Sequence, residues 1–167
     1  MGLFPPAAIG MPAAEIDTPA LVLELDRFER NLQSMRDAVR GSGARLRPHG
    51  KSHKCPEIAK RQIAAGAVGV CVQKLSEAQA LAEAGVADLY ISNEVVDAGK
   101  LAELAALAAR ARLAIAVDSG LGVDRLAAAL KAAGTSVDVF VEVDVGHGRC
   151  GVAPAAAASL AHQVVSH

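Results

Sequence analysis

The chain has 167 residues, with 17 basic and 18 acidic side chains, so its formal net charge is −1. This length suffices for one hydrophobic core, and the balanced charge leaves no basic surface for nucleic acid or an anionic membrane. Tryptophan is absent and Tyr90 is the single tyrosine, so the core must be aliphatic. No apolar run reaches the length that a membrane span requires.

Residues 1–17 lack the basic start and apolar stretch of a signal peptide, and we expect them to form an irregular leader. The three cysteines, Cys55, Cys71 and Cys150, show neither a C-x-x-C nor a zinc spacing, which is typical of reduced thiols in an intracellular protein. The sequence therefore predicts a cytoplasmic chain with one folded domain over residues 18–167.

Strands and helices alternate from residue 20 onward. Helix signals include Asp26 as an N-cap, Pro56 at a helix start, and Ser76 with Gln79 as a capping box. The predicted strands are 20–25, 44–47, 68–72, 88–92, 113–117 and 137–145, the last being the longest. The predicted helices are 27–40, 56–66, 77–84, 99–111, 122–133 and 154–165.

This alternation is typical of parallel α/β folds, in which strands buried on both faces are almost wholly apolar. A closed (β/α)₈ barrel takes about 250 residues, so this chain is too short to close one. We predict a partial (β/α)₈ barrel of five to six βα units. An open, doubly wound sheet that is complete in itself remains an alternative.

Lys51 lies just after the predicted strand 44–47, at the strand end where α/β barrels carry their chemistry. The neighbouring cations Arg47 and Lys54 disfavour a charged Lys51 amine, and desolvation acts in the same direction. An uncharged lysine can form a Schiff base with a carbonyl compound such as pyridoxal phosphate. On spacing alone, a solvated basic loop is the stronger interpretation.

Polar residues also follow the later strands. Gln73, Asn93 and Asp118 stand at strand ends, and Arg149 comes shortly after strand 137–145. Each alone is typical of a cap or turn. Because the carboxyl ends of parallel strands converge, we expect these side chains to share one mouth with Lys51.

Two other patterns point elsewhere. Gly146–Gly151 has the form G-x-G-x-x-G, but a dinucleotide site normally lies in an early βαβ unit with an acidic residue about 20 positions on. This segment follows the last predicted strand, so we expect only a close backbone turn. His49, His53 and Cys55 are interspersed with lysines, which oppose a cation, so we predict no metal site there.

The segment RPHGKSHKCPEIA, residues 47–59, resembles the pyridoxal-lysine segment of the D-threonine aldolase family, within the alanine-racemase-like (fold type III) enzymes. Matching motifs follow in order: GVCVQK at 69–74, ISNEVV at 91–96 and VEVDVGHGRCG at 141–151. The resemblance is collinear from about residue 18 to residue 152. It implies that the chain is the N-terminal part of such an enzyme.

The resemblance also implies roles for particular residues. Lys51 would be the Schiff-base lysine, and Arg149 would approach the 3-hydroxyl of pyridoxal phosphate. Gln73 and Asn93 would line the ring pocket, and His49 would touch the cofactor or substrate.

The implied reaction is the retro-aldol cleavage of a small-molecule D-β-hydroxy amino acid to glycine and an aldehyde. A divalent metal (manganese or magnesium) is implied, with its ligands in a C-terminal domain outside this chain, as is a homodimer in the full-length form. The alternatives are a D-3-hydroxyaspartate or D-serine dehydratase of the same family, and a non-catalytic pyridoxal-phosphate-binding fragment. We expect the chain alone to be inactive or nearly so.

Overall fold

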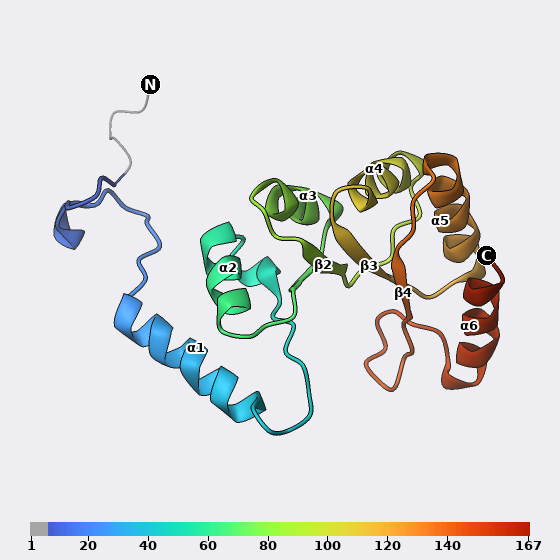
Figure 1. Cartoon of the computed structure of the whole chain (residues 1–167), viewed down its shortest axis with the longest axis horizontal. Coiled ribbons are helices and arrows are strands. Elements are labelled where there is room, and N and C mark those ends of the chain that lie inside the picture. Colours follow the sequence, from blue (N-terminus) through green and yellow to red (C-terminus); the bar gives the residue numbers. More distant parts are fainter. Residues whose placement is uncertain (1–6) are drawn as a thin grey trace.

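The computed structural model describes residues 7–167, which form a parallel sheet of four strands in the order β1-β2-β3-β4, with helices packed along it (Figure 1). The strands are β1 (Val70–Val72), β2 (Asp88–Ile91), β3 (Arg112–Val117) and β4 (Asp138–Val141). The helices are α1 (Leu25–Val39), α2 (Pro56–Ala64), α3 (Leu75–Glu83), α4 (Ala98–Ala108), α5 (Gly120–Ala133) and α6 (Ala157–Ser166). Short 3₁₀ turns are η1 (Ala13–Glu15), η2 (Gly50–Ser52) and η3 (Pro154–Ala156).

The core lies between one face of the sheet and helices α3, α4 and α5 (Figure 1). Consecutive parallel strands joined by right-handed crossovers place their helices on the same side of a sheet. Leu89 and Ile91 of β2 are fully buried there. On α4, Leu101, Leu104 and Leu107 are at most 1% exposed, which confirms the predicted apolar stripe. Burial of each such side chain contributes about 1.5–3 kcal/mol.

The other face of the sheet has no helix packed on it within residues 7–167. Because side chains alternate along a strand, this face carries Cys71, Tyr90, Ala114, Ala116 and Phe140. The rings of Tyr90 and Phe140 pack with their centroids 4.9 Å apart and tilted by 56°, and Phe140 is 54% exposed. The α/β class with parallel strands is therefore confirmed, with a second sheet face left open.

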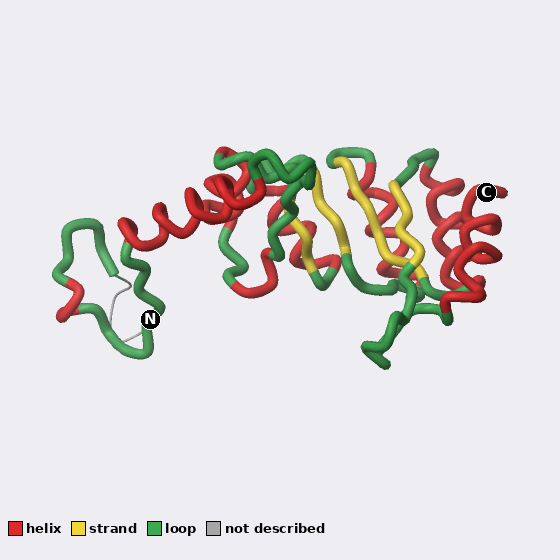
Figure 2. Tube along the Cα trace, turned by 90° about the horizontal axis from the view of Figure 1, so that it is seen from below, coloured by secondary structure: helices red, strands yellow, loops and turns green. Residues whose placement is uncertain are grey.

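One predicted strand is absent from the N-terminal arm, residues 7–43. Residues 20–24 form no strand, and Leu21, Val22 and Leu23 are exposed, because no neighbouring strand supplies backbone partners. Helix α1 begins at Leu25 with Glu24 as its N-cap, whereas the prediction had Asp26 as the N-cap of a helix that begins at Arg27. Figure 2 shows α1 and residues 7–24 before it extending away from the sheet.

The predicted strand 44–47 is also irregular. The segment runs beside β1, since Leu46 O accepts from Val68 N at 2.9 Å and Pro48 O accepts from Cys71 N at 2.8 Å. A single parallel bridge joins His49 to Cys71. Pro48 has no N–H to donate, which interrupts the ladder before a full strand can form.

The predicted strand 137–145 contracts to β4, four residues long, and β3 with six is the longest of the described strands. The chain leaves the ladder after Glu142, whose N–H donates to Val117 O at 2.9 Å. The Ser76–Gln79 capping box is wrong: α3 begins at Leu75. Pro56 opens α2 as predicted, and Gly134 ends α5 in the left-handed conformation at φ 65°.

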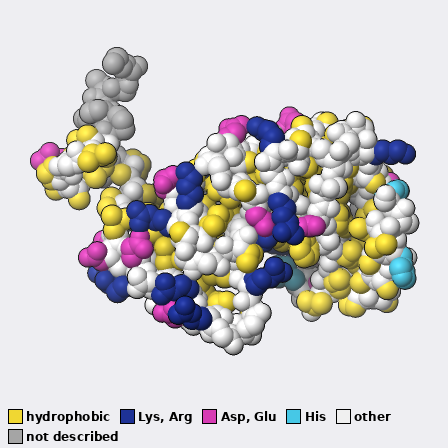
Figure 3. Space-filling model, in the orientation of Figure 1, with side chains coloured by type: hydrophobic (Ala, Val, Ile, Leu, Met, Phe, Trp, Pro, Cys, Tyr) yellow, Lys and Arg dark blue, Asp and Glu magenta, His cyan; other side chains and the backbone are white. Residues whose placement is uncertain are grey.

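Among residues 7–167, no helix combines the length and the hydrophobicity that crossing a membrane demands. On the side of the molecule that Figure 3 presents, basic and acidic side chains are interspersed. This distribution agrees with the near-neutral charge of the sequence.

Candidate active site

Lys51 lies in η2, a 3₁₀ turn that follows the irregular segment beside β1. The N–H of Lys51 donates to Nδ1 of His49 at 3.3 Å, and Ser52 Oγ donates to His49 O at 3.3 Å. Gly50 is buried against the sheet, where an added Cβ would lie 3.0 Å from Cγ1 of Val70. The turn is therefore pressed onto β1, while the Lys51 side chain stays exposed.

His49 reaches the end of β2 through its other ring nitrogen. Nε2 lies 3.3 Å from Oγ of Ser92, and Ser92 Oγ donates to Val72 O at 3.2 Å. Burial lowers the pKa of His49, and the positive charge of Lys51 lowers it further, while Glu77 opposes the shift. The ring is thus held in its neutral form close to the lysine.

Gln73 and Asn93 follow the ends of β1 and β2. Both line a groove between the starts of α3 and α4. The Gln73 N–H donates to Oε2 of Glu77 at 2.9 Å, which ties it to the first turn of α3. His49 and Lys51 do not line this groove, so these four residues are not shown in one cavity.

Arg149 joins a group of polar side chains beyond β4. Its Nη2 lies 3.9 Å from Oε1 of Glu142, and its Nε donates to Sγ of Cys150 at 3.3 Å. Atoms of Glu94, Glu142 and Cys150 lie within 4.8 Å of one another. Burial raises the pKa of Glu94, and its hydrogen bond to Glu142 raises it further.

The glycine-rich segment forms a loop around a carboxylate. Oδ1 of Asp144 accepts from the N–H groups of Gly146 and Gly148 at 2.9 and 3.0 Å. Those two bonds, with Gly148 first, lower the pKa of Asp144. Gly151, at φ +100°, passes so close to residue 144 that an added Cβ would lie 2.6 Å from its backbone nitrogen. The expected close backbone turn is therefore present.

Three residues near the proposed mouth were not predicted as site residues from the sequence: Ser92, Glu94 and Glu142. Glu142 continues the alternation that places Phe140 on the open face, and this period of two was the available signal. Ser92 and Glu94 flank Asn93 just past β2. Nothing in the sequence distinguishes them from ordinary cap or turn residues.

Cys71 is also near the lysine turn. Burial raises the pKa of its thiol, while hydrogen bonding to Ser92 and the charges of Arg47 and Lys51 oppose that rise. Cys71 faces away from the helices, and the bridge between His49 and Cys71 places the start of the lysine turn beside it. None of the three cysteines forms a disulfide.

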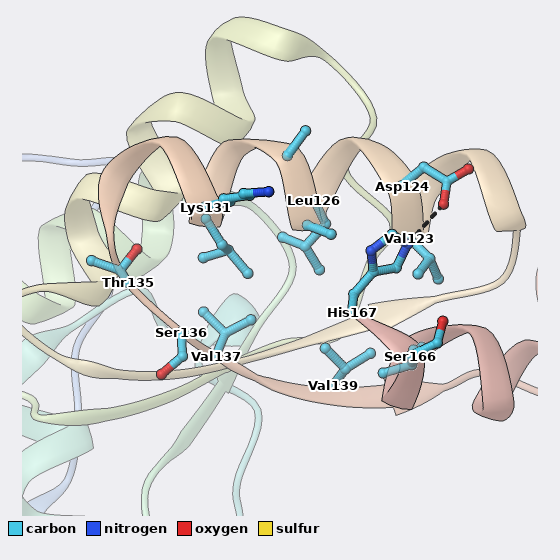
Figure 4. Close-up of a pocket in the computed structure, with 14 residues that line it drawn as sticks. Val123, Asp124, Leu126, Lys131, Thr135, Ser136, Val137, Val139, Ser166 and His167 are labelled. Atoms are coloured by element: carbon cyan, nitrogen blue, oxygen red, sulfur yellow. Dashed lines mark hydrogen bonds and ion pairs between the residues drawn. The ribbon is translucent and has the colours of Figure 1, made fainter.

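A second groove lies among α5, β4 and α6 (Figure 4). Its lining is largely aliphatic, and its one polar pairing joins His167 Nε2 to Asp124 Oδ1 at 3.0 Å. Hydrogen bonds from Gln163 and then His167 lower the pKa of Asp124. The groove borders the start of β4, whereas Lys51 and Arg149 follow strand ends. It is therefore not part of the candidate active site.

Comparison with known proteins decides the family. Residues 23–167 match the family described as alanine racemase, N-terminal domain. The chain belongs to this family. Its sheet is thus part of an alanine-racemase-like barrel, as predicted, with four parallel strands described in place of the expected five to six units.

Among curated relatives, a D-threonine aldolase from Arthrobacter sp is 51% identical over 152 residues, covering 91% of this chain and 40% of that protein. A 3-hydroxy-D-aspartate aldolase from Paracoccus denitrificans is 44% identical over 149 residues, covering 88% and 38%. The chain thus spans less than half the length of these relatives.

Solved structures give the same kinds of relatives as the sequence comparison. The crystal structure of D-threonine aldolase from Filomicrobium marinum superposes with a TM-score of 0.94 at 52% identity, covering 96% of this chain and 44% of that one. D-threo-3-hydroxyaspartate dehydratase from Delftia sp. HT23 gives a TM-score of 0.80 at 34% identity, covering 90% and 39%.

Proposed function

We propose that this chain is the lysine-bearing part of a pyridoxal-phosphate-dependent lyase of the D-threonine aldolase type, which cleaves D-β-hydroxy amino acids to glycine and an aldehyde. The observation that carries the proposal is the 51% identity to the Arthrobacter D-threonine aldolase, which extends over 91% of this chain. Because the chain covers 40% of that relative, the activity belongs to the longer protein in this proposal.

The chemistry of the available side chains fits pyridoxal phosphate. Lys51 offers a primary amine in a turn fixed against β1. Arg149 offers a guanidinium suited to an anionic oxygen, and Gln73 and Asn93 offer amides at neighbouring strand ends. We assign Lys51 to the aldehyde, Arg149 to the 3-hydroxyl, and the two amides to the ring.

Pyridoxal phosphate, when bound, supplies an aldehyde that condenses with an amine with loss of water, and a ring that accepts the electron pair of the broken bond. Lys51 would hold the cofactor and later carry a proton to the substrate carbon through Nζ. Arg149 would orient the cofactor by pairing with its charged oxygen, and His49 would keep the lysine turn in place and touch the substrate.

The described residues do not offer a suitable site for the divalent metal that the resemblance implies. Mg²⁺ and Mn²⁺ prefer oxygen ligands, whereas the Glu94–Glu142–Cys150 cluster includes a thiol and has the Arg149 guanidinium 3.9 Å from one carboxylate oxygen. In this proposal the manganese or magnesium ligands lie outside this chain. A homodimer of the full-length protein and a cytoplasmic location belong to the same proposal.

A dehydratase acting on D-3-hydroxyaspartate or D-serine is the second candidate, since a D-threo-3-hydroxyaspartate dehydratase from Delftia sp. matches at 36% identity over 138 residues. The aldolase matches at 44% and 51% favour carbon–carbon cleavage. A third candidate, a pyridoxal-phosphate-binding fragment without catalysis, predicts binding with no turnover in any form of the protein.

The test combines binding with turnover. Purified chain mixed with pyridoxal phosphate should develop a visible absorbance band that Lys51→Ala removes and that Lys60→Ala, a change at an exposed lysine of α2, retains. The longer protein with manganese should release glycine from D-threonine, whereas the 167-residue chain alone should release little or none. A band that survives Lys51→Ala would refute the assignment of the lysine.

A further inference from the structure

We infer that Ser92 is a positioning residue for Lys51, acting through the imidazole of His49. This inference rests on the proposed function of Lys51 and assigns a role to a side chain that the sequence motifs left without one. The contacts form one continuous path from the lysine turn to the ends of two strands.

The first link determines which nitrogen of His49 carries the proton. Nδ1 accepts the N–H of Lys51 at 3.3 Å, so in the neutral ring the proton must lie on Nε2. Nε2 then donates to Ser92 Oγ, 3.3 Å away. The neutral form is favoured because burial and the charge of Lys51 both lower the pKa of the ring, and Glu77 is the opposing charge.

The second link anchors the path in the sheet. Ser92 follows β2 directly, and its N–H and its hydroxyl both donate to Val72 O, at 2.9 and 3.2 Å. The hydroxyl donates to Val72 O and accepts from His49, and its second lone pair faces other neighbours such as the Cys71 thiol. Val72 and Ile91 beside it are fully buried, so the anchor is rigid.

The path matters because, although backbone contacts hold the turn against β1, few side chains act on Lys51 itself. Among the described side-chain hydrogen bonds, the Lys51 backbone has only the one to His49, and the Lys51 side chain is exposed. Without the bond to His49, the backbone of Lys51 could vary and present its amine in several directions, and orientation contributes strongly to reaction rate. Ser92 therefore fixes the direction of approach of Lys51 without contacting the cofactor or substrate.

Two readouts on the 167-residue chain test this role. Long-range ¹H–¹⁵N spectra of the imidazoles report which ring nitrogen of His49 is protonated. Borohydride trapping after mixing with pyridoxal phosphate, followed by peptide mass spectrometry, reports the rate of modification at Lys51. The variants are Ser92→Ala, the hydroxyl-retaining Ser92→Thr, and Ser136→Ala as a control at an exposed serine before β4.

In the unsubstituted chain we expect a His49 ring protonated on Nε2. Ser92→Ala should shift it toward a mixture of tautomers and slow Lys51 modification about three- to tenfold, the range expected for loss of one partly buried hydrogen bond. Ser92→Thr and Ser136→Ala should leave both readouts close to the starting values.

Two results would overturn the inference. One is a Ser92→Ala chain, folded by circular dichroism, in which neither the His49 tautomer nor the Lys51 rate changes. The other is an Nδ1-protonated His49 in the unsubstituted chain. Failure of Lys51 to react in the unsubstituted chain would instead refute the proposed function, and the imidazole spectra alone would then decide whether Ser92 positions His49.

Discussion

The same four strands present two different faces. Toward α3, α4 and α5 the strand side chains are aliphatic, and Val70, Leu89 and Ile115 are at most 1% exposed. Toward the open side they carry a thiol, a phenol and an exposed phenyl ring on Cys71, Tyr90 and Phe140. The comparison indicates that stability resides on the covered face, whereas the residues proposed for chemistry gather past the strand ends.

The largest expected effect lies on the covered face. Leu89→Ala should lower the free energy of unfolding by about 2–5 kcal/mol, because Leu89 is fully buried and truncation leaves a cavity. Urea unfolding followed by circular dichroism measures the loss. Leu121→Ala, at a 58% exposed position, is the control and should change stability by about 0.5 kcal/mol or less. Equal losses would contradict the assigned core.

A smaller loss is expected in the loop after β4. Gly151→Ala should destabilise the chain by about 1–3 kcal/mol, because residue 151 has φ +100° and a new Cβ would lie 2.6 Å from Asp144 N. Gly146→Ala provides a matched control, since φ is +117° there and nothing lies within 4 Å of the added atom. Both variants suffer the strain of a positive φ, so the difference between their unfolding free energies measures the cost of the steric clash at residue 151.

A pH-dependent effect is expected at Glu94, whose folded-state pKa is raised first by burial and then by Glu142. A raised carboxyl pKa makes ionisation unfavourable in the folded state. Stability is therefore retained below the unfolded pKa near 4.5 and lost as the pH rises through the folded pKa. Glu94→Gln should raise stability at pH 7 by about 1 kcal/mol or less and change little at pH 3.5. Measuring the free energy of unfolding of both proteins at pH 7 and pH 3.5 checks the sign of this stability change.

The smallest effect on stability is expected at the residue proposed to matter most for chemistry. Lys51→Met should change the free energy of unfolding by about 0.5 kcal/mol or less, because the side chain is exposed. The same variant should lose all modification by pyridoxal phosphate at this position. A large loss of stability would show that Lys51 supports the fold. It would contradict the separation between residues that stabilise the fold and residues proposed for chemistry.

Sequence reasoning recovered the elements whose signals are local. The stripe of Leu101, Leu104 and Leu107 and the proline at the start of α2 lie where they were predicted. The prediction failed where a neighbouring strand decides the outcome. Residues 20–24 have strand-like composition but no partner, and Pro48 interrupts the ladder beside β1.

The candidate site was predictable only in part. Gln73 and Asn93 share a groove that Lys51 does not line, and Arg149 lies beyond β4, so the single mouth expected for these residues stays a prediction. The hydrogen bond of Ser92 to His49 joins residues 43 positions apart, and no local pattern encodes such a distant contact. The roles of His49 and Lys51 stay predictions, supported by the turn that joins them.

The Tyr90–Phe140 pair gives the molecule an intrinsic optical probe. Tyr90 is the single tyrosine of a chain without tryptophan, so all tyrosine emission arises from one ring, packed 4.9 Å from Phe140. Tyr90 pairs in register with Cys71 on the open face, and Cys71 is bridged to His49 at the start of the lysine turn. Pyridoxal phosphate bound near this ring should quench its emission, so binding of the cofactor can be followed without any label.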